Sequence, residues 1–201
     1  MMHYHIITVT DLHQNCSLIW CDQTKEAALV DPGGEALRLC LEIDKFDINL
    51  TKIVLTHGHL DHVGASNTLA KHYGVPIIGP HSADKFMLEN LPLQCQIFGW
   101  PVIYSFLPDS WLANGDIINV GMERYHVLHC PGHSPGHIVL LNKIRKFIIM
   151  GDVLFRDSIG RTDLPGGNAQ ILIDSINNQL LTLADDIIFF ARTWVNVHYW
   201  L

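Results

Sequence analysis

A short stretch rich in histidine and aspartate is the feature of this sequence that most directly indicates chemistry. His57 and His59 are two residues apart after a short apolar run, and Asp61 and His62 follow at once. In an extended segment, residues i and i+2 project to the same side, so both imidazoles of the first pair can reach one ion. The side chains of the adjacent residues Asp61 and His62 point in different directions, so they can bind a second ion nearby. Because neutral imidazole is the commonest metal ligand in proteins, this stretch predicts a metal site.

Two further segments supply candidate ligands. His133 lies in residues 128–137, which are rich in histidine and in the turn residues proline and glycine. Asp152 comes directly after the hydrophobic residues 146–150 and Gly151. Nitrogen and oxygen donors from separate segments are typical of a site for Zn²⁺, Mn²⁺ or Fe²⁺. A structural zinc site would instead be built from cysteines. The five cysteines are scattered, odd in number and without a C-x-x-C pair, which argues against a disulfide framework.

Composition narrows the class of protein. The chain has 201 residues, of which 48% are hydrophobic and 16% charged, as expected for one compact domain. Thirteen Lys and Arg against twenty Asp and Glu give a net charge of −7, which argues against a nucleic-acid partner and an anionic membrane surface. No apolar run approaches the roughly 20 residues that span a bilayer, and no signal peptide is visible at the N-terminus. We therefore expect a cytoplasmic protein without a nucleic-acid or membrane partner.

The candidate ligands must be positioned by strands and helices, which the apolar pattern places in two similar halves. Strands are predicted at residues 3–10, 16–21, 26–30, 52–55 and 77–78, and again at 116–120, 124–129, 137–141, 146–150 and 187–190. Helices are predicted at residues 35–45, 63–73, 84–91 and 168–183. The inner face of the last helix is expected to carry Ile171, Leu172, Ile176, Leu180 and Leu183. Residues 92–114 are expected to form a lid or a loop. This order of elements predicts two sheets covered by helices on their outer faces.

Three motifs together resemble the metallo-β-lactamase superfamily. They read Thr-His-Gly-His-Leu-Asp-His at residues 56–62, Pro-Gly-His-Ser-Pro-Gly-His at 131–137, and Gly-Asp-Val-Leu-Phe at 151–155 followed by Gly-Arg-Thr-Asp at 160–163. Their combination resembles the glyoxalase II-like (hydroxyacylglutathione hydrolase-like) branch in its compact bacterial type, and the similarity runs from about residue 3 to Phe190. The resemblance implies an α+β fold, a four-layer αββα sandwich over residues 1–190, in agreement with the predicted element order.

The resemblance also implies a ligand set for a binuclear metal centre, with zinc as the expected metal and iron or manganese as alternatives. By this similarity, His57, His59 and His133 hold one ion, Asp61 and His62 hold the other, and Asp152 bridges them. Asp61 is also the implied catalytic residue. Around the centre, the similarity implies the following supporting or neighbouring residues: Asp31 and Asp163 in support, His129 and His137 as neighbours rather than ligands, and Cys130 as a small packed residue.

The implied activity is hydrolysis of a small glutathione thioester of the S-lactoylglutathione type by a metal-bound hydroxide. Two divalent ions about 3.5–4 Å apart lower the pKa of a water enough for this near neutral pH, and the chain has no Gly-x-Ser-x-Gly nucleophile elbow. The residues that hold the glutathione part cannot be assigned, although Arg161 and residues 85–111 are candidates. One alternative is a persulfide dioxygenase-like enzyme with a single Fe²⁺ on His57, His133 and Asp152. Another is an inactive metal-binding relic.

The C-terminal residues depart from the family pattern. The family has a Pro-Gly-His-Gly-Pro-x-Ser-Thr segment after its last strand, and that histidine completes the second metal site. Here residues 191–201 read Ala-Arg-Thr-Trp-Val-Asn-Val-His-Tyr-Trp-Leu, and their possible codons read one base later permit Pro-Gly-His-Gly. We interpret residues 191–201 as an aberrant tail produced by a frameshift, with His198 as a substitute ligand the alternative. The second metal site, and with it the activity, is expected to be weakened.

Overall fold

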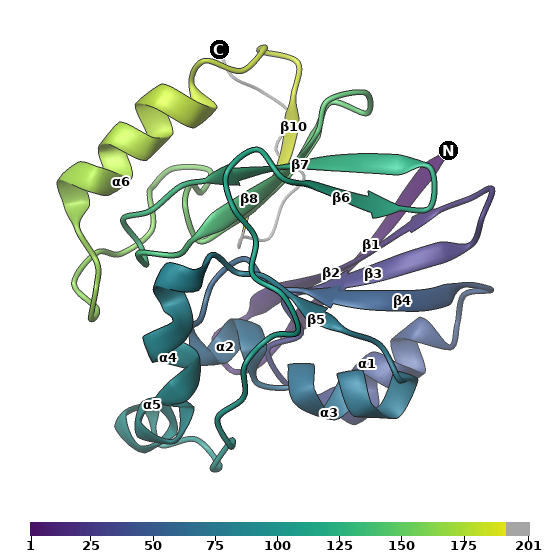
Figure 1. The fold of residues 1–201 in the computed structure, drawn as a ribbon, viewed down its shortest axis with the longest axis horizontal. Coiled ribbons are helices and arrows are strands. Elements are labelled where there is room, and N and C mark those ends of the chain that lie inside the picture. The colour runs from purple at the N-terminus through teal and green to yellow at the C-terminus, as the bar shows by residue number, and fades with distance from the viewer. Residues whose placement is uncertain (192–201) are drawn as a thin grey trace.

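Two five-stranded sheets form the centre of the computed structural model, which describes residues 1–191 (Figure 1). The first sheet has the order β1-β2-β3-β4-β5, with β1 at Met2–Val9, β2 at Gln14–Cys21, β3 at Glu26–Val30, β4 at Asn49–Val54 and β5 at Ile77–Ile78. The second has the order β10-β9-β8-β7-β6, with β6 at Ile117–Val120, β7 at Glu123–His129, β8 at Ile138–Asn142, β9 at Phe147–Gly151 and β10 at Ile188–Ala191. In each sheet antiparallel pairing gives way to parallel pairing, at β3–β4 in the first and at β9–β10 in the second.

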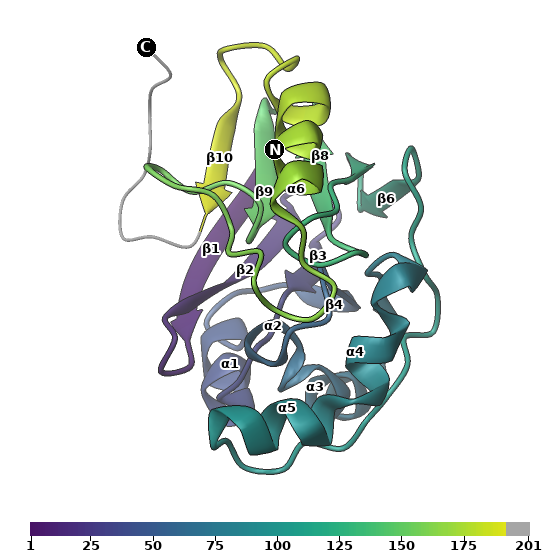
Figure 2. The same cartoon turned by 90° about the vertical axis from the view of Figure 1, so that its left-hand side faces the viewer.

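Helices cover the outer faces of both sheets. The α-helices are α1 (Ala36–Ile43), α2 (Leu60–Val63), α3 (Ser66–Tyr73), α4 (Lys85–Glu89), α5 (Leu91–Phe98) and α6 (Ala169–Ser175). A 3-10 turn at Ser82–Asp84 precedes α4, and one π-helical turn at Ile176–Leu180 continues α6. Figure 1 shows α1 and α3 below the first sheet and α6 above the second, and Figure 2 shows α4 and α5 beside α2. This arrangement is the expected four-layer αββα sandwich.

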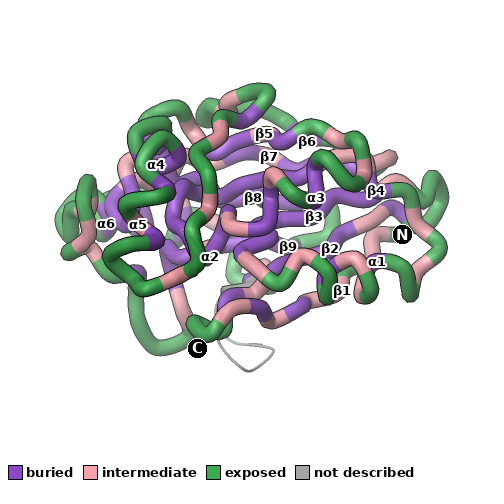
Figure 3. Tube along the Cα trace, turned by 90° about the horizontal axis from the view of Figure 1, so that it is seen from below, coloured by how far each residue is buried: buried purple, intermediate pink, exposed green. Residues whose placement is uncertain are grey.

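Strands β2 and β3 in the middle of the first sheet bury both of their faces. Successive side chains of a strand point to opposite faces, and in β2 Leu18 packs towards the helices while Ile19 packs between the sheets. Tyr125 and Leu140 from the second sheet meet Ile19 in that inner layer. The buried segments accordingly run through the middle of the molecule, whereas the helices present exposed residues outward (Figure 3). The centre of the sandwich is thus a closed apolar layer.

The predicted helices agree with the structure in position but not in every boundary. The single helix expected at 63–73 is divided into α2 and α3, and α2 begins at Leu60, which places Asp61 and His62 on a helical turn. The prediction of a lid or loop at 92–114 was wrong in part, because α5 occupies Leu91–Phe98. Pro92 lies in the first turn of this helix, and Leu91 and Cys95 are buried. The prediction that Ile171 lies on the inner face of the last helix was also wrong, because this residue is 45% exposed.

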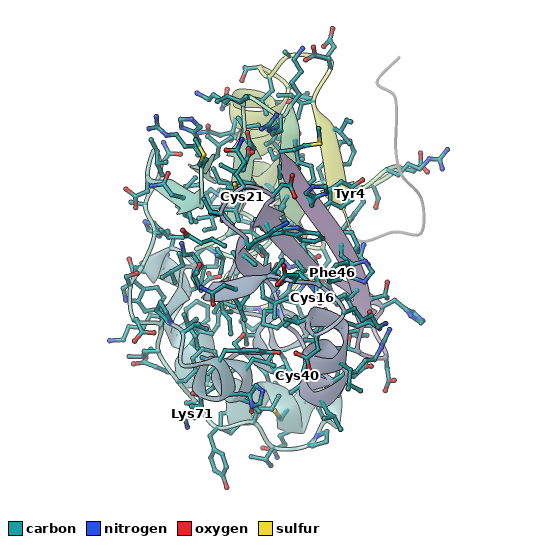
Figure 4. All side chains as sticks on the ribbon, turned by 90° about the vertical axis from the view of Figure 1, so that its right-hand side faces the viewer. Tyr4, Cys16, Cys21, Cys40, Phe46 and Lys71 are labelled. Carbon is teal, nitrogen blue, oxygen red and sulfur yellow. The ribbon has the colours of Figure 1, made fainter. Side chains whose placement is uncertain are left out.

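Two further features concern the cysteines and the lengths of the helices. All five cysteines are free thiols, and Cys16 and Cys21 of β2 and Cys40 of α1 lie apart from one another (Figure 4). Among residues 1–191, no helix combines the length and the apolar character needed to cross a bilayer.

The inner layer generates a stability prediction. Leu140 is 1% exposed and packs in the inter-sheet cluster, so Leu140→Ala leaves a cavity where neither sheet can relax easily. We expect the free energy of unfolding, measured in urea, to fall by about 2–5 kcal/mol. Ile144→Ala is the matched control, because Ile144 is 77% exposed and its loss is expected to cost less than about 0.5 kcal/mol. Equal losses in the two variants would contradict this account of the core.

Candidate metal centre

The predicted ligands come from three connections that each follow the carboxyl end of a strand. His57 and His59 follow β4, and α2 carries the next two candidates a few residues later. His133 lies in the connection between β7 and β8, and Asp152 comes directly after β9. The two sheets face each other, so these strand ends bring residues far apart in the sequence to one edge of the sandwich. The six predicted ligands are all buried: His57, His59, Asp61, His62, His133 and Asp152.

The candidate ligand atoms converge in two overlapping groups. One ligand atom from each of His57, His59 and His133 lies within 4.8 Å of the others. A second group of the same compactness joins His57, His62 and Asp31. The first group has the three residues predicted for the first metal. The second group shares His57 with the first. It adds His62, a predicted ligand of the other metal, and Asp31, which was expected only to support the centre.

The hydrogen bonds around His57 fix which ring nitrogen can bind an ion. Thr56 Oγ1 lies 2.6 Å from Asp31 Oδ2 and donates to that carboxylate. The same hydroxyl lies 3.0 Å from His57 Nδ1 and therefore accepts its proton. In the neutral ring, Nε2 then carries the lone pair, and this buried atom has no hydrogen-bond partner. A buried acceptor without a partner is costly, and a cation in the cluster would provide one. The residues therefore fit a divalent metal.

His59 and His133 bring ring nitrogens to the same place. His133 Nδ1 lies 2.8 Å from the Arg161 carbonyl oxygen, which can only accept, so this nitrogen carries the proton and Nε2 is left as an acceptor. That Nε2 lies 2.9 Å from His59 Nδ1. A carbonyl that fixes the tautomer of a ligating histidine is a recurrent feature of metal sites. His133 is therefore fixed in one tautomer, and a shared cation would take the place of the contact between the two rings.

Asp152 lies between the two groups. Its Oδ1 is 3.3 Å from His62 Nε2, and its Oδ2 is 3.7 Å from His133 Nε2. The two carboxylate oxygens thus face one histidine from each predicted metal site. Asp61 is on the same side, with Oδ2 3.8 Å from His62 Nε2. This is the placement that a bridging carboxylate needs.

The electrostatic environment divides the histidines into two kinds. Burial lowers the pKa of His57 and His59 well below its usual range, and neighbouring histidines lower it further. Burial likewise lowers the pKa of His133. For His62, burial alone would lower the pKa, but the carboxylates of Asp152, Asp61 and Asp31 raise it well above the usual range. The first three imidazoles are therefore neutral near pH 7, the form that binds metals.

Comparisons with known proteins agree with this geometry. The family model described as the metallo-beta-lactamase superfamily matches residues 9–192. The chain belongs to the metallo-beta-lactamase superfamily. Hydroxyacylglutathione hydrolase GloC of Haemophilus influenzae is 51% identical over 191 residues, which cover 94% of this chain and 90% of that protein.

Two solved structures share the fold. BLEG-1 B3 metallo-beta-lactamase has a TM-score of 0.86 and 31% identity, over 94% of this chain and 90% of that one. TTHA1623 in a di-iron-bound form has a TM-score of 0.84 and 32% identity, over 93% and 90% of the two chains. The agreement with the metallo-beta-lactamase fold therefore extends over nearly the whole chain.

The residues expected around the centre differ in their placement. Asp31 lies beside it, because its carboxylate contacts both Thr56 and His62 Nδ1, the latter at 2.9 Å. Asp163 is exposed and forms a bidentate ion pair with Arg161. His129 lies 2.9 Å from the Pro135 carbonyl oxygen through Nε2 and stacks on the His81 ring. Of the remaining residues named from the sequence, Cys130 is fully buried and His198 lies outside the described residues.

Two supporting residues were missed or underrated by sequence analysis. Thr56 relays the hydrogen bond between His57 and Asp31, and the only hint in the sequence is a hydroxyl directly before the first ligand. His137 was expected only as a neighbour, but its Nε2 accepts the backbone N–H of Asp152 at 3.0 Å and its ring stacks on His57 with centroids 4.5 Å apart. His137 therefore supports the backbone of one predicted ligand and the ring of another.

A pocket opens beside the cluster. Its polar side contains predicted ligands from both metal sites, and its other wall is largely apolar. The residues of that second wall are Leu12, Leu60, Gln94, Phe98, Trp100, Arg161 and Leu164. A small substrate can therefore reach the predicted ligands through this pocket.

Close backbone packing at the site predicts a specific glycine requirement. A Cβ on Gly33 would lie 1.6 Å from the Asp61 carbonyl oxygen, so Gly33→Ala must push α2 and its carboxylate away. We expect the free energy of unfolding to fall by about 3 kcal/mol or more, the upper end of ordinary overpacking. Gly74→Ala is the control, because a Cβ there meets nothing within 4 Å and only its positive φ costs about 1–2 kcal/mol. A Gly33→Ala variant as stable as wild type would refute the close approach.

Proposed function

We propose that this chain is a metal-dependent hydrolase of hydroxyacylglutathione thioesters such as S-lactoylglutathione. The main support is the lone pair of His57 Nε2, which is buried without a hydrogen-bond partner at the point where His59 and His133 converge. The 51% identity to a protein named hydroxyacylglutathione hydrolase GloC supports the substrate class. Zinc is the proposed metal, and the di-iron form of a 32% identical relative keeps iron as a second candidate.

The proposed ligand roles follow the geometry. His57, His59 and His133 would hold one ion as neutral imidazoles, and Asp61 and His62 would contribute to a second. Asp152 would bridge, because its two oxygens face His62 and His133 separately. When bound, divalent ions supply acidified water and polarise the acyl carbonyl.

The protein's own groups complete the proposed reaction. Asp61 faces the pocket, and we assign it the role of accepting the proton of the attacking water. The reaction breaks the C–S bond of the thioester, and the water supplies the hydroxyl of the acid product. The thiolate leaves without a strong acid because the pKa of a thiol is about 8.5. The apolar wall of Phe98, Trp100 and Leu164 would face the substrate from the side opposite the predicted ligands.

This function predicts metal-dependent release of thiol. We expect S-lactoylglutathione to be hydrolysed, a chelator to abolish turnover, and added Zn²⁺ to restore it. His133→Ala should lower kcat/KM at least about 100-fold, the upper end of the effect of changing an outer-shell residue. Thiol release is measured with a chromogenic disulfide.

His129→Ala is the matched control for that variant. His129 lies in the same connection but bonds to Pro135 and stacks on His81, away from the cluster, so turnover should stay close to wild type. Oxygen uptake with glutathione persulfide, in place of thiol release, would favour the alternative of a mononuclear iron dioxygenase. Metal binding without turnover in either assay would identify a relic.

The C-terminal segment bears on the second metal. We propose that residues 1–190 form the catalytic domain and that residues 191–201 are an aberrant tail that supplies no ligand to the second site. In the proposed ligand set, Asp61 and His62 then share the second ion only with Asp152. The second site should be weaker than the first, and the activity correspondingly reduced.

Zinc titration tests this asymmetry. We expect calorimetry of the metal-free protein to show one ion bound at least about tenfold more tightly than the next, the scale of one altered interaction at a metal site. Replacing residues 191–194 by Pro-Gly-His-Gly should strengthen the second step and raise thiol release. Two equal steps in the unaltered chain would contradict the proposal.

A further inference from the structure

A fully buried carboxylate outside the predicted ligand set connects two of the ligand segments. Asp84 ends the 3-10 turn before α4, and its side chain accepts three hydrogen bonds. Oδ2 accepts the backbone N–H of Gly58 at 2.9 Å and the hydroxyl of Ser134 at 2.7 Å. Oδ1 accepts the backbone N–H of Gly136 at 2.5 Å. No motif in the sequence drew attention to Asp84.

The three donors belong to the segments that carry the first-site histidines. Gly58 is the residue between His57 and His59, and Ser134 directly follows His133. One carboxylate therefore joins the connection after β4 of the first sheet to the connection after β7 of the second. Asp84 itself belongs to neither compact ligand group, so any effect on a metal must pass through these segments.

Both segments are packed tightly against the Asp84 turn. A Cβ on Gly136 would lie 2.6 Å from Asp84 N and 2.7 Å from its Cγ. A Cβ on Gly58 would lie 2.8 Å from Met87 Cβ and 3.4 Å from Asp84 Cβ. The backbones thus approach the turn as closely as glycine allows, which leaves little freedom for either segment to shift.

The energetics favour keeping all three bonds. A carboxylate removed from water is costly unless donors surround it, and every partner of Asp84 is a donor. Burial raises the pKa of Asp84, and the bonds from Ser134, Gly58 and Gly136 oppose that rise. Separation of the two ligand segments would leave this buried charge without part of its compensation.

We propose that Asp84 is a positioning residue of the first metal site, which sets the distance between the His57–Gly58–His59 segment and His133. The inference rests on the metal binding put forward above as part of the proposed function. Asp84 acts on the ion only by holding these backbones in register, so its loss should weaken metal binding more than it weakens the fold.

A comparison within the chain sharpens the proposal. Gln94 of α5 also contacts the first segment, since it accepts Leu60 N–H at 3.0 Å and donates to the Gly58 carbonyl at 3.2 Å. No bond from Gln94 to residues 133–136 occurs in the described structure. Asp84 therefore differs from Gln94 in spanning both segments, and this is the property under test.

Cobalt binding to the metal-free full chain tests the proposal. Asp84→Asn replaces one acceptor oxygen by an NH₂ group that cannot accept, so at least one bond is lost. We expect Co²⁺ affinity, followed by the visible absorption of the bound ion, to fall about 10–100-fold, with an altered spectrum. Ser134→Ala removes a single bond and should give a smaller loss in the same direction, and it serves if Asp84→Asn does not fold.

Asp109→Asn is the matched control. Asp109 accepts the backbone N–H of Ile77 at 2.8 Å, away from the cluster, so the same substitution there leaves both ligand segments untouched and should keep wild-type Co²⁺ affinity and spectrum. If Asp84→Asn and Ser134→Ala lower only the unfolding temperature and leave Co²⁺ affinity and spectrum unchanged, Asp84 is a structural residue and the inference is wrong. Wild type that binds Co²⁺ no better than His133→Ala would instead refute the proposed metal site and the inference with it.

Discussion

Several nitrogen lone pairs must be kept pointing at one small, buried volume. Left to themselves, buried imidazoles would rotate to pair with one another or with nearby carbonyls, because an unpaired buried acceptor is unfavourable. The structure meets this constraint for three of the rings by occupying one nitrogen of each. Thr56 and the Arg161 carbonyl do so for His57 and His133, and Asp31 does so for His62. His57 and His133 are thereby each fixed in one tautomer, and the orientation of all three rings is fixed.

Those supports lead back to the two sheets. Asp31 follows β3 in a left-handed backbone conformation with φ of 52°, an uncommon choice for a residue other than glycine. From there its carboxylate reaches the Thr56 backbone N–H at 2.7 Å, so it ties the end of β3 to the end of β4 as well as orienting His62. Strain of this kind persists where the surrounding structure over-determines it. The fold therefore contributes to the chemistry through short links between strand ends, more than through the apolar layer that merely keeps the sheets together.

Much of this could be predicted from the sequence, because its signals are local. Alternating apolar runs located all ten described strands, and the spacing of His57 and His59 identified two side chains that converge. Contacts made across the fold could not be predicted. Asp84 lies 26 residues from Gly58 and 52 from Gly136, and nothing around it distinguishes it from a surface aspartate before a helix. Helix α5 was missed for a related reason: Leu91 and Cys95 bury one side while Ile97 and Phe98 remain exposed, so the apolar pattern has no clean helical period.

The two predicted metal sites are unequally supported by the described residues. The first draws histidines from connections on both sheets, and each connection is anchored by groups that are not ligands: Asp84 holds both backbones and His137 stacks on His57. The second depends on α2, a single turn of four residues whose position is set by Gly33 and by the bond from His62 to Asp31. A site anchored from several sides can keep its geometry when one neighbour changes. The geometry of a site on one short turn also depends on Asp152 and on the ligand that completes it. Changes elsewhere in the chain should therefore affect the second site before the first.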